Sequence, residues 1–156
     1  NKISKTKIAL IGYGKMGQEI DALCHGSDIF EVVSISFKNN LPPTSAGWVQ
    51  AGNDGLDLKS IAKADIAIDF TSKDVVLKNI EAVAKLGKNL VVGTTGWYDH
   101  LNTVKKITEK YKIGLIYSPN FSIGANIFFK IADFAAKLTA KFSDYDVYGL
   151  EIHHKA

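Results

Sequence analysis

The sequence predicts an α/β fold built on a doubly wound parallel sheet. Three observations support this prediction. Apolar runs of strand length alternate with segments of helical periodicity along the chain. A glycine-rich turn follows the first apolar run, and small, amide, hydroxyl or basic residues follow the later ones. Strictly alternating strands and helices favour parallel strands joined by right-handed crossovers.

The first turn has the spacing GxGxxG and lies between an apolar run that ends at Ile11 and a helical segment at residues 18–23. Gly12 permits the tight turn, Gly14 lets a diphosphate approach the backbone, and Gly17 lets helix and strand pack closely. Isolated patterns of this kind also occur in ordinary turns, but a strand before and a helix after favour a Rossmann-type dinucleotide site. The expected cofactor-binding residues of this turn are Gly12, Tyr13, Gly14, Lys15, Met16 and Gly17.

Composition excludes several other classes of protein. The chain has 156 residues, a length that corresponds to one domain or to one domain and part of another. Of these residues 46% are hydrophobic, which is enough to form a core. No apolar run approaches the length of a membrane span, which is about 20 residues, so no membrane association is expected. The basic residues are nineteen scattered lysines with no arginine, and the net charge is only +3, so nucleic acid is not an expected partner.

Cysteine usage bears on the compartment. Cys24 is the one cysteine, so no internal disulfide can form, and a reducing, cytoplasmic location is expected. Its position in the first helical segment favours a packing role. No metal site is expected.

The second strand is predicted at residues 30–36, after a helix end at His25 and Gly26. Its carboxyl end carries Ser36, Phe37 and Lys38, at the place where this fold meets the adenosine ribose. An acidic residue there would favour NADH, and none is present. Ser36 and Lys38 could accept a 2′-phosphate instead, which favours NADPH over NADH. Alternatively, Lys38 is only a solvent-exposed residue of a loop and contacts no cofactor.

The remaining chain continues the alternation. Residues 39–58 are expected to form a long surface connection, with one short strand near Trp48 and Val49. Further strands are predicted at 65–70, 89–92, 113–117 and 146–152. Helices are predicted at 61–62, 74–86, 99–111 and 126–141, with His100 at the surface.

Ligands of doubly wound sheets bind beyond the carboxyl ends of the strands. Three further loops of this sequence follow such ends, and we expect them to complete the cofactor site. Their residues are Phe70, Thr71 and Ser72; Gly93, Thr94 and Thr95; and Ser118, Pro119, Asn120 and Phe121.

Five segments of the sequence together resemble the dihydrodipicolinate reductase family. They are GYGKMG at 12–17, IDFT at 68–71, VGTTG at 92–96, SPNFSIGAN at 118–126 and EIHHK at 151–155. The resemblance implies a dinucleotide-binding domain over residues 1–125. It also implies that residues 126–156 form a hinge helix and the first strand of a truncated α+β substrate domain, and that the complete protein is a homotetramer.

The activity implied by this resemblance is NAD(P)H-dependent reduction of 4-hydroxy-tetrahydrodipicolinate to tetrahydrodipicolinate in lysine and diaminopimelate biosynthesis. The substrate is then a small dicarboxylate. The family pattern makes His153 the general acid and places His154 and Thr95 against the substrate. Histidine titrates at about 6.5 when unperturbed, which suits proton delivery near neutrality. Without the resemblance, the histidine pair would be interpreted as solvated residues at a strand end.

Two other functions are compatible with the motifs. One is another Rossmann reductase, of the aspartate or homoserine dehydrogenase type. The other is a non-catalytic nucleotide-binding module. Under the preferred interpretation, this chain alone binds cofactor without turning over substrate.

Overall fold

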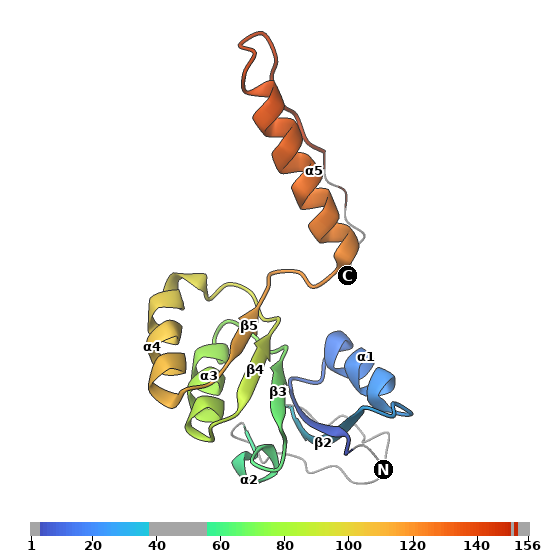
Figure 1. Cartoon of the computed structure of the whole chain (residues 1–156), viewed down its shortest axis with the longest axis vertical. Coiled ribbons are helices and arrows are strands. Elements are labelled where there is room, and N and C mark those ends of the chain that lie inside the picture. The colour runs from blue at the N-terminus through green and yellow to red at the C-terminus, as the bar shows by residue number, and fades with distance from the viewer. Residues whose placement is uncertain (1–3, 38–55, 151, 153–156) are drawn as a thin grey trace. The chain divides into compact units, whose positions relative to one another are not determined.

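The computed structural model describes residues 4–37, 56–150 and 152 (Figure 1). The strands are β1 (Thr6–Ile11), β2 (Phe30–Ser36), β3 (Ile66–Asp69), β4 (Asn89–Val92) and β5 (Leu115–Tyr117). The helices are α1 (Lys15–Cys24), α2 (Leu58–Ile61), α3 (Val76–Lys85), the 3-10 turn η1 (Tyr98–His100), α4 (Leu101–Tyr111) and α5 (Ile123–Thr139).

The five strands form one parallel sheet in the order β2-β1-β3-β4-β5. The chain moves outward to β2 after β1 and then crosses back to β3, so the strand order reverses between β1 and β3. Crevices for ligands open at this kind of reversal, beyond the carboxyl ends of the strands. The predicted α/β fold is therefore confirmed.

Both faces of the sheet are covered by helices. Successive side chains of β1 point to opposite faces, so β1 contributes to the core on each side. Ile8 and Leu10 pack with Ile35 against α1, through Ile20 and Cys24. Ala9 and Ile11 belong to a larger core on the other face, which includes side chains of α2, α3 and α4. In Figure 1, α1 accordingly lies away from α3 and α4. Cys24 packs against this smaller core as expected, and partial burial raises the pKa of its thiol.

Most predicted elements are present with small shifts at their ends. Strands β2 and β4 have the predicted limits. The expected helix at 99–111 is divided into η1 and α4, with His100 at the junction. Helix α5 begins at Ile123 rather than at 126, because Ser122 caps it by accepting a hydrogen bond from Ala125 N at 3.4 Å.

One predicted strand is wrong. The described residues between 146 and 152 form no strand, although their sequence alternates as a strand would. A strand needs a neighbouring strand to satisfy its backbone groups, and no strand pairs with this segment among the described residues. The predicted surface connection lies largely outside the described residues, as does the short strand near Trp48.

The chain divides into two compact units, Asn1–Pro119 and Asn120–Ala156. The first contains the whole sheet, and the second contains α5. The division falls before α5, whereas the sequence places it after residue 125. The assignment of the second unit to a substrate domain stays a prediction.

Candidate functional site

The glycine turn joins β1 to α1 at the reversal of strand order. Gly12 has a φ of +91°, and a Cβ there would overlap the carbonyl oxygen of Phe70. A Cβ on Gly17 would overlap the carbonyl oxygen of Gly12. At Gly14, by contrast, a Cβ would meet no atom within 4 Å. Two of the glycines are thus needed by the fold, while the third leaves open space over the backbone.

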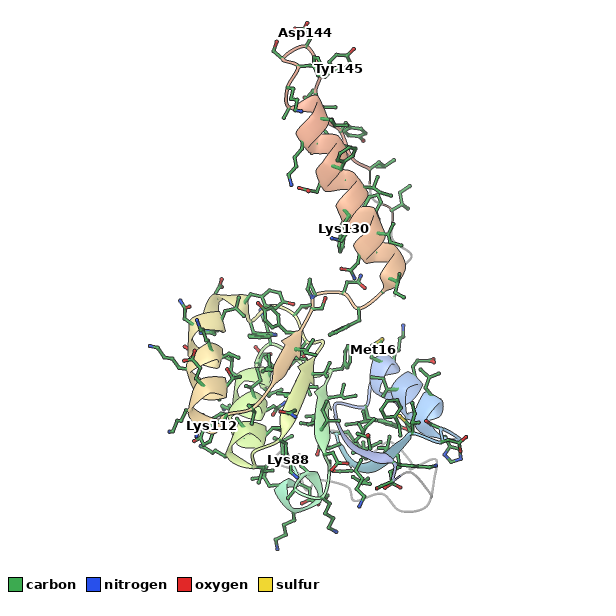
Figure 2. All side chains as sticks on the ribbon, in the orientation of Figure 1. Met16, Lys88, Lys112, Lys130, Asp144 and Tyr145 are labelled. Atoms are coloured by element: carbon green, nitrogen blue, oxygen red, sulfur yellow. The ribbon has the colours of Figure 1, made fainter. Side chains whose placement is uncertain are left out.

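Helix α1 presents its amino-terminal end at this open space. Gly14 is the N-cap and has no side chain to accept from the first N–H groups. The first helical hydrogen bond runs from Gln18 N to Gly14 O at 3.0 Å, so the N–H groups of Lys15 to Gly17 precede the ladder. Met16 lies at the sheet edge where the strands end, opposite to Lys88 and Lys112 (Figure 2). This arrangement fits a diphosphate.

The loop after β3 lies between the glycine turn and the loop after β4. Phe70 N donates to Ile11 O at 2.8 Å, and Gly93 N donates to Asp69 O at 2.9 Å. A Cβ on Gly93 would fall on the ring of Phe70, so only glycine permits this packing. The structure therefore brings together three of the predicted loops, at Gly12, at Phe70 and Thr71, and at Gly93 and Thr94.

A buried carboxylate, absent from the sequence-based site, organises these loops. Asp69 is fully buried and accepts hydrogen bonds from Thr71, Thr94 and Asn79. Burial raises the pKa of Asp69, although the hydrogen bonds oppose the shift. One signal could have revealed this group. Asn79 is the polar position within the otherwise apolar face of α3 formed by Val76, Ile80 and Val83.

Trp97 anchors the far end of the loop after β4. Its indole is 1% exposed, and Nε1 donates to Thr94 O at 2.7 Å. Tyr98 and Tyr117 pack around the indole, with ring centroids 5.2 and 5.3 Å from it. Thr94 is therefore held at both its side chain and its backbone, while Thr95 is exposed at the rim. Ser72, in the loop before α3, is also exposed.

The expected ribose end of the site is only partly described. The Tyr13 and Phe37 rings lie 6.2 Å apart, and Tyr13 OH donates to Asp21 Oδ2 at 2.7 Å. Ser36 is 3% exposed, and within the described residues its hydroxyl has no hydrogen-bond partner. The structure thus places this hydroxyl in the interior rather than at the surface. Lys38 lies outside the described residues.

Of the remaining predicted site residues, some belong to the first unit, some belong to the second, and some lie outside the described residues. Ser118 N donates to Val92 O at 3.3 Å, which holds the Ser118–Pro119 pair beside the end of β4. Asn120 and Phe121 begin the second unit, where Asn120 O accepts from Asn126 Nδ2 at 2.9 Å. His153 and His154 lie outside the described residues.

The described residues contain no group of three or more histidine, cysteine, aspartate or glutamate side chains able to hold a metal ion. Among those same residues, no helix combines the length and apolarity needed to cross a bilayer.

Comparison with known proteins identifies relatives. Residues 6–121 match the family model described as dihydrodipicolinate reductase, N-terminus. A 4-hydroxy-tetrahydrodipicolinate reductase from Methanocaldococcus jannaschii is 37% identical over 133 residues, which are 83% of this chain and 44% of that protein. One from Christiangramia forsetii is 35% identical over 147 residues, which are 94% of this chain and 55% of that protein. The chain thus spans about half the length of these relatives.

Solved structures give the same result. A dipicolinate-bound dihydrodipicolinate reductase from Paenisporosarcina sp. TG-14 is similar with a TM-score of 0.68 and 27% identity, over 85% of this chain and 54% of that one. The WlbA dehydrogenase from Bordetella pertussis, solved with NADH and UDP-GlcNAcA, has a TM-score of 0.60 at 18% identity, over 76% of this chain and 36% of that one, and shows the fold alone. The family model and the matches to reductases favour the expected family over aspartate or homoserine dehydrogenases. The chain belongs to the dihydrodipicolinate reductase family.

Proposed function

We propose that this chain binds a reduced nicotinamide dinucleotide across the carboxyl ends of β1, β3 and β4. The observation that supports the proposal is the contact of three loops at the reversal of strand order, with open space over Gly14 and the amino end of α1 beside it. The diphosphate would lie at Gly12 to Gly17. The nicotinamide would lie toward the residues Phe70, Thr71, Ser72, Gly93, Thr94, Thr95, Ser118, Pro119, Asn120 and Phe121.

We further propose that the protein to which this chain corresponds reduces 4-hydroxy-tetrahydrodipicolinate, a small dicarboxylate. The names of the relatives and the dipicolinate in the Paenisporosarcina structure support this substrate. The cofactor supplies the hydride. His153 would supply the proton, and His154 and Thr95 would contact the substrate.

The choice between the two cofactors can be tested at Lys38. We propose that NADPH is preferred, because no acidic residue follows β2 and Lys38 could pair with the 2′-phosphate. Titration calorimetry should show that Lys38→Ala lowers the affinity for NADPH by roughly tenfold, which is the effect of losing one charge-assisted hydrogen bond. The affinity for NADH should fall far less. Lys88→Ala, at the edge of the sheet opposite to Met16, is the matched control (Figure 2). Equal losses for both cofactors would contradict the proposal.

The role of His153 can be tested in the full-length protein. His153→Ala should lower kcat by about a hundredfold or more, because general acid catalysis contributes at least that factor. The dissociation constant of the reduced cofactor should stay unchanged. His100→Ala, in the first unit at the start of α4, serves as the control. An unaltered kcat in His153→Ala would remove this residue from the proposed acid role.

A further inference from the structure

Asp69 is a buried acid that the proposed function leaves without a role. The residue closes β3, and none of its surface is exposed. Its Oδ1 accepts from Thr71 N at 3.0 Å, Thr71 Oγ1 at 2.7 Å and Thr94 Oγ1 at 2.8 Å, and its Oδ2 accepts from Asn79 Nδ2 at 2.8 Å. The ion pairs found among the described residues do not include it. Four neutral donors therefore solvate this carboxylate in place of water.

The donors come from three different elements. Thr71 belongs to the loop after β3, Thr94 to the loop after β4, and Asn79 to α3. We call these three residues and Asp69 the carboxylate clasp. Burial without hydrogen bonds would be costly for such a group, so the clasp holds only when all three elements are in place.

Thr94 is fixed within the clasp at both its side chain and its backbone. Its Oγ1 donates to Asp69 and accepts from Thr71 N at 2.8 Å, so both directions of the hydroxyl are used. Its carbonyl oxygen accepts from Trp97 Nε1. Because its side chain and its backbone are both fixed, Thr94 determines where the backbone of the next two residues, Thr95 and Gly96, runs. An apolar side chain here would remove one donor to Asp69 and leave the Thr71 N–H with Asp69 Oδ1 as its remaining acceptor.

We propose that Asp69 is a positioning residue for the nicotinamide end of the cofactor, acting through Thr71 and Thr94 without touching the cofactor itself. This inference rests on the proposed function. Its burial keeps Asp69 away from any ligand, while the two loops that it joins are those assigned to the nicotinamide. The donors to Asp69 belong to Thr71, Thr94 and Asn79, which lie outside the glycine turn that would hold the diphosphate.

The test separates the two ends of the cofactor. Calorimetry would compare NADH with ADP-ribose, and NADPH with 2′-phospho-ADP-ribose, since the second ligand of each pair lacks the nicotinamide. Thr94→Val removes the hydroxyl at nearly constant volume. This substitution should lower the affinity for both dinucleotides by about tenfold, as expected for the loss of one buried hydrogen bond. The affinities for the two ADP-ribose ligands should change by less than about twofold. Thr94→Ser should restore dinucleotide binding.

A matched control and a second variant sharpen the comparison. Thr108→Val removes the hydroxyl that donates to Lys105 O in α4 at 2.9 Å, and it should change the affinity for neither ligand of a pair. Urea unfolding of each variant shows whether it is folded, and Thr94→Ala replaces Thr94→Val if the latter does not fold. Equal losses for both ligands of a pair, or no loss, would overturn the inference. Failure of the wild-type chain to bind any dinucleotide would instead remove the proposed function, and the inference with it.

Discussion

The glycines of the first turn serve separable purposes. Gly12 needs its positive φ and its closeness to the Phe70 carbonyl group, and Gly17 lies against the Gly12 carbonyl group. These are requirements of folding, because a side chain at either position would displace backbone atoms. Gly14 has an ordinary φ of −77° and open space beside it. Under the proposed function, glycine is needed at that position because the diphosphate would approach the backbone there.

Alanine substitutions should separate these roles. Gly12→Ala and Gly17→Ala are expected to lower the free energy of unfolding by about 2 kcal/mol or more, because each forces backbone to shift. Gly14→Ala should change that free energy little but weaken dinucleotide binding. Urea unfolding and calorimetry measure the two quantities. Gly87→Ala, at a φ of +67° with no atom near its Cβ, should cost only about 1 kcal/mol and leave binding unchanged.

A stability loss at Gly14→Ala equal to that at Gly17→Ala would contradict this division. Retained dinucleotide affinity in Gly14→Ala would show that no phosphate approaches the backbone there.

At the scale of elements, the carboxylate clasp links β3, β4 and α3 through one ionisable group. Because the pKa of Asp69 is raised in the folded chain, the folded chain holds this proton more tightly than the unfolded chain does. The resulting contribution to stability is complete below the unfolded pKa of about 3.9. It is lost as the pH rises through the folded value.

This contribution is best measured against Asp69→Asn, which cannot titrate at this position. The free energy of unfolding of the wild type relative to Asp69→Asn should fall as the pH rises from about 4, because only the wild type loses a proton there. Urea unfolding at a series of pH values measures this difference, and other groups such as Asp57 and Glu81 cancel in it. A difference that stays constant or grows with pH would show that Asp69 does not titrate above its ordinary range.

The elements themselves could largely be predicted, whereas the clasp could not. Apolar runs bounded by glycine or polar residues set the limits of β2 and β4. The wrong strand at 146–152 has the correct alternation, but pairing depends on partners that lie elsewhere in the chain. Asp69 stands in the recognised IDFT segment, yet its importance comes from Thr71, Asn79 and Thr94 converging on it. That convergence is a tertiary contact and leaves only a weak trace in the sequence.

At the scale of the whole chain, the two units differ in how they treat apolar side chains. The first buries them on both faces of its sheet. In the second, no residue of α5 is buried, although the helix carries a continuous apolar face. Its large members are between 44 and 64% exposed, and they are Ile127, Phe128, Ile131, Phe134 and Leu138.

Exposed apolar faces of this size promote association. We therefore expect the chain to self-associate as its concentration rises, with an increase in sedimentation coefficient measured by analytical ultracentrifugation. A Phe128→Lys and Phe134→Lys double variant should shift this association to higher concentration, because two charges would then have to be desolvated at the contact. Lys130→Ala, on the same helix, is the control. A monomer throughout the concentration range would contradict this expectation.

The hydrogen bond between the Trp97 indole and the Thr94 carbonyl group has a practical consequence. Tryptophan emits light in the band that reduced nicotinamides absorb, so an indole anchored beside the proposed cofactor site would be a built-in optical reporter. The chain has two tryptophans, and replacing Trp48 with phenylalanine would leave Trp97 as the sole donor for resonance energy transfer. Quenching of its emission would then follow occupancy of the neighbouring loops in real time, without any attached dye.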